Sequence, residues 1–188
     1  GSRPDAGRNA CLAADDLALR LHDMMNVFNK HDSRFEPDYS TFEPTMRYAN
    51  VEGVNIIPGD DVFCMDCRIL PCYTLAEVNA EARRRCSEVE KKYGVKISYT
   101  TPQAEESPAT PDNAPAVLKL AAAIKEAHGI TAKTIGIGGG TVAADLRQQG
   151  YNAVVWSTLD DMAHQPDEYC IIENIKKDAK TLALLFGV

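Results

Sequence analysis

One histidine of this chain lies in a polar stretch where it could bind a metal ion. His164 lies in the polar stretch "STLDDMAHQPDEYCII" at residues 157–172, between a predicted apolar strand and a predicted apolar helix. Four acidic residues surround it in sequence, and imidazole is a common zinc ligand. The histidine could equally lie in a turn whose acidic residues favour the first turn of the following helix. Spacing alone leaves both interpretations open.

The motif "CMDC" at residues 64–67 could indicate a thiol redox site or a zinc site. It lies in a predicted strand, where residues three apart point to opposite faces, so Cys64 and Cys67 favour a structural interpretation. Asp66 and Arg68 are two apart and share a face. Such a pair is usually solvated, but an arginine in this position can also bind a carboxylate at two points.

The stretch "GIGGGT" at residues 136–141 resembles a phosphate-binding loop only loosely. It lacks the final glycine of the dinucleotide fingerprint and the Gly-Lys-Ser/Thr of a P-loop. Glycines nevertheless allow a ligand to approach the backbone closely. The backbone amides of Thr141 and Val142, which open a predicted helix, could therefore bind an anion or a carboxylate.

The elements that position these residues fall into two regions. The first region is predicted to run helix, strand, strand, helix, strand, at residues 9–28, 45–51, 61–70, 74–94 and 95–100. Asn9 suits an N-cap, and Thr74 with Glu77 forms a capping box. The two central strands are predicted to pair antiparallel. This order matches a ferredoxin-like layer that lacks its first strand.

A stretch rich in Pro, Glu, Ser and Thr at residues 101–115 predicts a linker, with a domain boundary near residue 108. The second region is predicted to contain elements at residues 113–129 (helix), 133–140 (strand), 141–150 (helix), 152–158 (strand) and 171–186 (helix). Strand, helix and strand with short loops favour a parallel βαβ unit. The last helix is predicted to face inward with Ile171, Ile172, Ile175, Ala179, Leu182 and Phe186. The fold class is therefore α/β.

Composition restricts the partners and the compartment. The net charge is −7, and the basic residues are spread along the chain, so we do not expect nucleic acid as a partner. No apolar run approaches the roughly 18 residues of a membrane span, so we expect no membrane partner. The six cysteines are irregularly spaced, and no signal-peptide pattern opens the sequence. Both observations favour the cytoplasm.

Four motifs in order, "GSRPDAGRNA", "GVNIIPGDDVFCMDCRILP", "GIGGGTVAADLRQQG" and "MAHQPDEY", resemble the di-zinc family of carboxypeptidase G, aminoacylase, acetylornithine deacetylase and succinyl-diaminopimelate desuccinylase. The chain looks most like archaeal-type members of that family that are described as desuccinylases or general metallo-hydrolases. The resemblance implies a catalytic domain with a two-metal site, interrupted by a ferredoxin-like lid that dimerises. Residues 1–108 would then be the lid or dimerisation domain, without its first strand. Residues 109–188 would be the carboxyl-terminal part of the catalytic domain.

The same resemblance implies roles for five residues. His164 matches the last metal ligand of the family, while Asn55 and Arg68 match lid residues that contact substrate. Gly140 and Thr141 match the loop that holds the substrate carboxylate. The implied activity is hydrolysis of an amide bond in N-acyl amino acids or small peptides. Two zinc ions are the implied cofactor, with cobalt or manganese as alternatives, and a homodimer through the lid is implied.

The family's His-x-Asp motif, bridging aspartate, Glu-Glu pair and lid histidine are expected upstream of Gly1. Val142 and Ala143 also replace the small-Asp pair that often follows the glycine-rich turn. We therefore expect this polypeptide alone to be inactive and to bind zinc weakly or not at all. One alternative is a dimerisation module without its own catalysis, and another is a thiol redox domain that uses Cys64 and Cys67.

Overall fold

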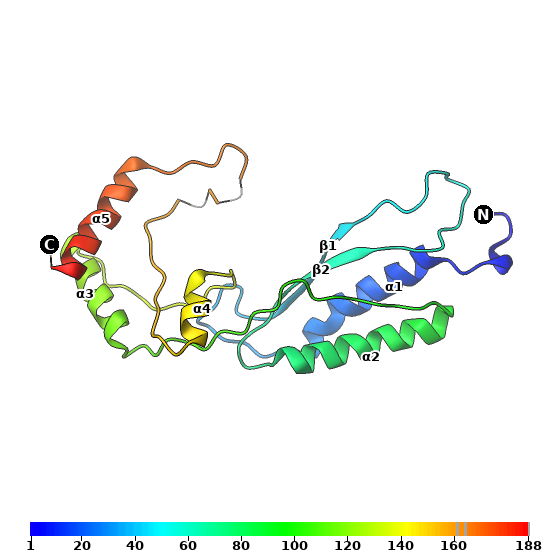
Figure 1. Ribbon diagram of the computed structural model, residues 1–188, viewed down its shortest axis with the longest axis horizontal. Coiled ribbons are helices and arrows are strands. Elements are labelled where there is room, and N and C mark those ends of the chain that lie inside the picture. The colour runs from blue at the N-terminus through cyan, green and yellow to red at the C-terminus, as the bar shows by residue number, and fades with distance from the viewer. Residues whose placement is uncertain (161, 164, 188) are drawn as a thin grey trace. The chain divides into compact units, whose positions relative to one another are not determined.

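The computed structural model describes residues 1–160, 162–163 and 165–187, and the chain forms two compact units. The first unit contains Gly1–Glu106 together with Gly136–Gly138. The second contains Ser107–Ile135 and the residues from Gly139 onward. Figure 1 shows the elements of each unit.

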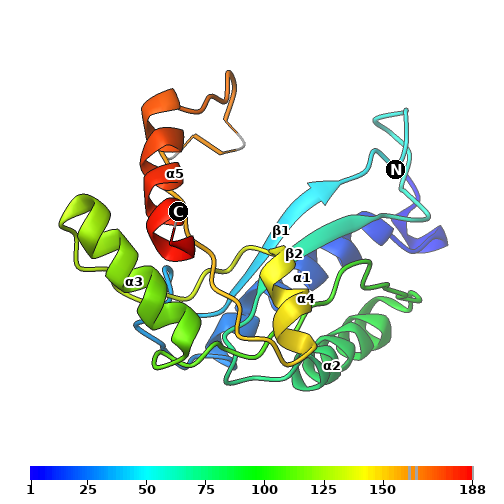
Figure 2. The ribbon, with the colours of Figure 1, turned by 60° about the vertical axis from the view of Figure 1, so that its left-hand side comes forward.

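The first unit packs two helices against a two-stranded sheet. Its elements are η1 (Pro4–Ala6), α1 (Ala10–His22), η2 (Asp23–Asn26), β1 (Thr41–Arg47), β2 (Phe63–Arg68) and α2 (Leu75–Tyr93). Helices α1 and α2 lie side by side in both Figure 1 and Figure 2, and α1 also packs against β1. Helix, strand, strand and helix therefore follow in the predicted order.

Side-chain capping decides where the two long helices of the first unit begin. The Asn9 side chain accepts hydrogen bonds from the amides of Cys11 and Leu12 at 3.1 and 3.3 Å, which confirms the predicted N-cap of α1. The Thr74 amide donates to the Glu77 carboxylate at 2.8 Å, and the Glu77 amide donates back to the Thr74 hydroxyl at 3.2 Å. This reciprocal pair confirms the capping box of α2.

Two apolar clusters hold α1, α2 and the sheet together. The first consists of Ala13 and Leu17 of α1 and Cys86 and Val89 of α2. The second consists of Met24, Phe28, Phe42 and Val78. Both clusters contain residues of the two predicted helical regions, 9–28 and 74–94. Burying each large side chain contributes about 1.5–3 kcal/mol, so these clusters supply the main stabilisation of the first unit.

The sheet is an antiparallel pair, as predicted. Thr41 lies opposite Arg68 and Glu43 lies opposite Asp66, with an irregularity in the register between Pro44 and Arg47. Strand β1 begins at Thr41, four residues earlier than the sequence indicated. The register therefore places the Asp66 and Arg68 end of β2 against the first residues of β1.

The prediction of a strand at residues 95–100 is wrong, because the described sheet contains only β1 and β2. Side chains of α2 bind the backbone of this segment instead. The Ile97 amide donates to the Glu90 carboxylate at 2.8 Å, and the Ile97 carbonyl accepts from Arg83 at 3.1 Å. The amide and the carbonyl of Ile97 are thus already hydrogen-bonded and do not need a neighbouring strand. The ferredoxin-like arrangement of this region stays a prediction.

The second unit contains α3 (Pro115–His128), α4 (Val142–Gln148) and α5 (Ile172–Phe186). Helix α3 ends at Gly129, whose φ of 71° is the left-handed conformation expected of a glycine C-cap. Helices α3 and α5 pack together and lie close in both ribbon views. A hydrogen bond of 2.8 Å between His128 Nε2 and Thr181 Oγ1 joins them.

The prediction of a parallel βαβ unit is wrong for the described residues, because neither 133–140 nor 152–158 forms a strand. Here too, side chains take the place of strand neighbours. The Thr158 amide donates to the Asp178 carboxylate at 2.9 Å, and the Thr110 hydroxyl donates to the Ala153 carbonyl at 2.6 Å. A buried parallel strand needs neighbouring strands for its hydrogen bonds, and periodicity in one segment cannot supply them.

The predicted inward face of α5 is also wrong. Ile172 and Phe186 are 71% and 73% exposed, whereas Asn174 and Thr181 are the buried residues of this helix. Helix α5 meets α3 through the side that carries Thr181, so its apolar stripe reaches solvent. Although this stripe is exposed, none of the described helices has the length and the apolar composition needed to cross a membrane.

Candidate substrate-binding site

Arg68, the last residue of β2, forms a two-point ion pair with Asp66. Its Nε donates to Asp66 Oδ1 at 2.6 Å and its Nη2 donates to Asp66 Oδ2 at 2.7 Å. The shared strand face predicted for these residues is therefore confirmed. The hydrogen bonds that Arg68 donates to Asp66 raise the pKa of Arg68, so the guanidinium stays charged. About half of the Arg68 side chain remains accessible to solvent.

Arg68 also binds the start of the glycine-rich turn. Its Nη1 donates to the Gly138 carbonyl at 2.9 Å, and both residues belong to the first unit. The Gly136 amide donates to the Arg34 carbonyl at 2.7 Å. A Cβ at Gly136 would lie 2.3 Å from the Phe35 ring, so this close approach requires glycine. Residues 136–138 are thus held beside the Arg68 guanidinium.

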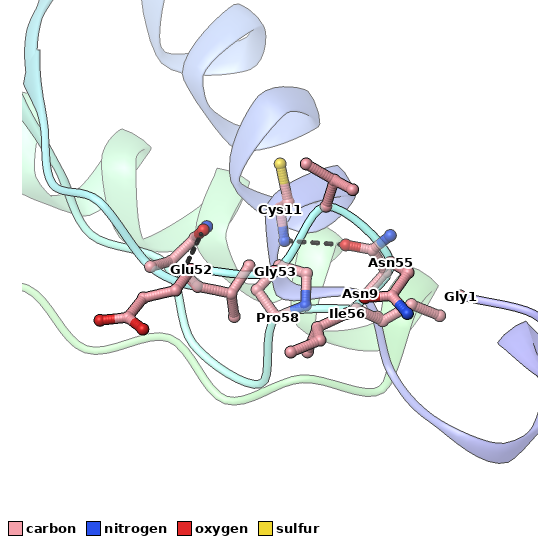
Figure 3. Close-up of a pocket in the computed structure, with 12 residues that line it drawn as sticks. Gly1, Asn9, Cys11, Glu52, Gly53, Asn55, Ile56 and Pro58 are labelled. Carbon is pink, nitrogen blue, oxygen red and sulfur yellow. Dashed lines mark hydrogen bonds between the residues drawn. The ribbon is translucent and has the colours of Figure 1, made fainter.

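Asn55 lies in the loop between β1 and β2 and lines a pocket of about 370 Å³. The pocket is formed by residues 50–58 together with Gly1, Asn9 and Cys11. Figure 3 shows Asn9 and Cys11, at the start of α1, beside Asn55 and Pro58 of the loop. Arg68 does not line this pocket, so the structure does not bring the two predicted substrate-binding residues of the first unit into one cavity.

An ion pair between the partly exposed Arg47 and the buried Asp61 carboxylate anchors this loop. The Asp61 side chain is 1% exposed and accepts from Arg47 Nε at 3.0 Å and Arg47 Nη2 at 3.1 Å. The Asn50 side chain donates to the same carboxylate at 2.7 Å. The hydrogen bonds that Arg47 donates to Asp61, and then to Asp15, raise the pKa of Arg47. Two side chains, Arg47 and Asn50, therefore donate three hydrogen bonds to one carboxylate at the base of the Asn55 loop.

The sequence interpretation missed this ion pair, because "PGDD" indicated only a turn. A usable signal was present in the sequence. Arg47 and Asp61 are opposite charges at the two ends of a loop that joins antiparallel strands, where cross-strand neighbours come close. Hairpin pairing places such residues together even though 14 positions separate them in sequence.

Gly140 and Thr141 lie in the second unit. Thr141 is the N-cap residue of α4, with extended backbone angles, and its carbonyl accepts from the Ala144 amide at 2.9 Å. Nothing in this geometry tests whether these two residues bind a carboxylate, so their role stays a prediction. His164 lies outside the described residues, and its predicted role as a metal ligand is likewise untested.

The described residues do not by themselves fit a two-metal centre. Among residues 1–160, 162–163 and 165–187, no group of three or more His, Cys, Asp or Glu side chains could hold a metal ion. A zinc centre requires about four ligands. No reaction step through a metal therefore follows from these residues.

The thiol redox interpretation gains no support from the cysteines. All six lie among the described residues and are free, Cys64 and Cys67 included. Part of Cys67 reaches solvent, yet desolvation of its thiol, and then the nearby Asp66 charge, raise its pKa to about 11. Redox catalysis requires a thiolate near neutral pH, and this environment favours the protonated thiol.

The arrangement of helices and sheet is similar to part of a solved structure. The structure is similar to the M20 family metallo-carboxypeptidase Sso-CP2 from Sulfolobus solfataricus, with a TM-score of 0.73. The similarity covers 98% of this chain and 53% of that chain at 16% sequence identity, a level that shows the fold alone. The chain is therefore a mixed α/β fragment, which confirms the α/β fold class in its coarse form.

Residues 10–187 match the family described as Peptidase family M20/M25/M40, and the chain belongs to this family. It is 38% identical over 190 residues to an uncharacterized metallohydrolase of Methanocaldococcus jannaschii, covering 96% of this chain and 46% of that protein. An uncharacterized metallohydrolase of Methanococcus maripaludis is also 38% identical, over 96% of this chain and 47% of that protein. The chain spans about half the length of these relatives. The predicted family is confirmed, and the desuccinylase-like subgroup stays a prediction.

Proposed function

We propose that this chain is part of a metal-dependent hydrolase that cleaves an amide bond in N-acyl amino acids or small peptides. The observation that carries the proposal is the match of residues 10–187 to the M20/M25/M40 family. The names of its relatives, metallohydrolases in two cases and a metallo-carboxypeptidase in the third, agree with this reaction class. Desuccinylase or deacylase activity is the form that we propose.

Arg68 is the proposed binding group for the substrate carboxylate in the first unit. It is charged, half exposed and oriented by Asp66, which supports this role. A guanidinium has five N–H donors, and a planar fork of donors matches a carboxylate. We propose that Asn55 contacts substrate from its own loop. We further propose that the backbones of Gly140 and Thr141 bind the carboxylate end of the substrate.

We propose that His164 supplies one ligand to a centre of two zinc ions, with cobalt or manganese as alternatives. The described residues offer no centre of their own, so we expect the isolated chain to be inactive. Free cysteines agree with a reducing compartment, and we propose the cytoplasm.

A chimera provides the sharpest test of this proposal. This chain replaces the matching part of the Methanocaldococcus jannaschii metallohydrolase, and metal-dependent release of amino acid from N-succinyl and N-acetyl amino acids is measured. Arg68→Ala should raise KM, because loss of a charge-assisted two-point contact costs about 1.5–3 kcal/mol, or about 10- to 150-fold. Arg68→Lys keeps the charge but loses the fork, so its KM should rise less.

Arg84→Ala serves as the matched control. Arg84 also pairs with two carboxylates, Glu81 and Glu88, but it lies on the exposed side of α2. Its KM should equal that of the parent chimera. A folded, metal-loaded chimera that hydrolyses no N-acyl amino acid or small peptide would refute the proposed reaction. Equal KM values for Arg68→Ala and the parent would refute the role of Arg68.

A second proposal is that the first unit forms a homodimer. Its support is the two-stranded sheet, because each described strand pairs on one side and leaves its other edge for another chain. Light scattering of the purified chain across a range of concentrations tests this proposal. A mass of 20.6 kDa at every concentration would exclude the dimer.

A further inference from the structure

We propose that Arg47 and Asp61 form a positioning pair that holds the loop carrying Asn55 in its substrate-binding conformation. This inference rests on the proposed function, because it assigns a purpose to the Asn55 loop. Neither residue lines the pocket itself. Both act through the loop, and Arg47 also acts through the start of α1.

The Asp61 carboxylate joins both ends of the loop. It accepts from Arg47, the last residue of β1, and from Asn50 near the beginning of the loop. Asp61 itself lies near the end of the loop, two residues before β2 begins. The Tyr48 amide donates to the Val62 carbonyl at 3.0 Å beside this carboxylate. The loop is therefore closed at its base by one charged group and one backbone hydrogen bond.

Arg47 also connects the loop base to α1. Its Nη1 pairs with Asp15, and its Nη2 donates to the Cys11 carbonyl at 3.3 Å. A separate backbone bond of 3.1 Å runs from the Ala10 amide to the Pro58 carbonyl. One guanidinium thus contacts the helix start on one side and the loop base on the other. Cys11, whose carbonyl Arg47 contacts, lines the pocket together with the Asn55 loop (Figure 3).

Because the Asp61 carboxylate is buried, loss of this ion pair should perturb the structure more than loss of a surface ion pair. The Asp61 side chain is almost fully buried, and an uncompensated buried carboxylate is strongly unfavourable. Without the guanidinium, the carboxylate loses two of its three hydrogen-bond donors, and the base of the loop loses the bonds that close it. The clusters that hold α1 and α2 together contain neither residue, so the helices can stay packed while the loop moves. Loss of Arg47 should therefore disorder residues 50–58 selectively.

Amide hydrogen exchange of the full chain, read by mass spectrometry, tests this selectivity. Arg47→Met keeps the aliphatic stem and removes the guanidinium. Exchange across residues 50–58 should accelerate about tenfold or more, while α2 peptides change by less than about twofold. Arg47→Lys should give an intermediate acceleration, because one ammonium cannot reach all of the partners of a guanidinium. The control is Arg84→Met, which should leave loop exchange unchanged.

Asp61→Asn provides a second variant, with the same acceleration expected at residues 50–58. Unchanged loop exchange in Arg47→Met would overturn the inference. Equal acceleration throughout the first unit would also overturn it, since the pair would then stabilise the whole unit. Failure of both the Arg47→Met and Asp61→Asn chains to fold would also overturn the inference, because the pair would then stabilise the whole unit.

Titration with a ligand tests whether the pair positions Asn55 for substrate binding. N-acetylglycine is the probe, and the side-chain amide signal of Asn55 is followed by NMR. In the parent chain this signal should shift at millimolar probe, and the shift should weaken in Arg47→Met and partly return in Arg47→Lys.

The affinity for the same probe is also measured by isothermal titration calorimetry, in the parent chain, in Asn55→Ala and in Arg47→Met. Unchanged affinity in Asn55→Ala would refute the proposed role of Asn55 and leave the exchange result to decide on the positioning pair. Weaker affinity in Asn55→Ala but not in Arg47→Met would refute the positioning pair alone.

Discussion

Replacement of Glu81 by glutamine should destabilise the first unit in a pH-dependent way. Glu81 lies on α2 and accepts from Arg85 Nε at 2.7 Å and from Arg84 Nη2 at 2.6 Å. The Arg85 side chain is only 8% exposed, and it also pairs with Asp23 at 3.3 Å. Glu81 therefore compensates a buried guanidinium that joins α2 to the end of α1.

The pKa of Glu81 sets an upper limit on the effect. Hydrogen bonds from Arg84, and then from Arg85, lower this pKa from 4.5 to about 2. At about 1.4 kcal/mol per pKa unit, the difference corresponds to about 3 kcal/mol. Solvent screens the exposed Arg84 partner, and Asp23 still pairs with Arg85 in the variant. We therefore expect Glu81→Gln to lower the free energy of unfolding by about 1–2 kcal/mol at pH 7.

The sign of the pH dependence follows from the lowered pKa. A carboxyl whose pKa is lower in the folded state contributes its full stabilisation above its unfolded pKa, near 4.5. This contribution is lost as pH falls through the folded pKa, near 2. By pH 3, less than about half of it should remain. The difference between the parent chain and Glu81→Gln should therefore shrink on acidification.

Urea unfolding at pH 7 and pH 3 measures this difference. NMR signals of α2 amides report on the first unit separately from the second, which matters because two units need not unfold together. Glu52→Gln is the control, since Glu52 is an exposed acid of the same unit and its loss should change stability by less than about 0.5 kcal/mol. An equal loss for Glu81→Gln at both pH values would show that packing, and not charge, is the cause. No loss at pH 7 would refute the reasoning entirely.

Three further outcomes follow from local geometry. Thr74→Ala should lower the free energy of unfolding by about 1 kcal/mol, because the capping box with Glu77 is lost. Thr74→Ser should keep the capping box, and urea unfolding compares the two variants. Gly94→Ala should cost about 1–2 kcal/mol in the same assay because φ is 66° there, and a loss below about 0.3 kcal/mol would contradict this reason. Cys67 should react with a thiol reagent at pH 8 more slowly than an unhindered thiol, because desolvation and Asp66 raise its pKa to about 11; a faster rate would count against this environment.

Local chemistry made several features predictable. The N-cap at Asn9, the capping box at Thr74 and the glycine C-cap at Gly129 each depend on residues within one helical turn. The pairing of Asp66 with Arg68 depends only on the alternation of side chains along a strand. These features involve neighbours in sequence, so a single segment contains all the information that they require.

The predicted strands failed because a strand is a relation between segments. Residues 95–100, 133–140 and 152–158 have suitable apolar residues, but side chains such as Glu90 and Asp178 bind their backbones. The apolar stripe of α5 failed for a related reason. Periodicity identifies which residues share a face, but the packing partner decides whether that face is buried.

By itself, the sequence determined the family, the starts of the helices after Asn9 and Thr74, and the strand face that carries Arg68. Motif order and short-range capping encode these features, and neither requires knowledge of distant contacts. The predicted end of the first helix at residue 28 was wrong, because α1 ends at His22. Only the tertiary structure decided that Arg68 meets Gly138 and that Arg47 meets the buried carboxylate of Asp61. Each of these contacts joins residues far apart in the chain. They form because folding brings opposite charges, or donor and acceptor groups, together. The hairpin pattern indicates which ends of the loop come close, but only the folded chain shows which groups pair.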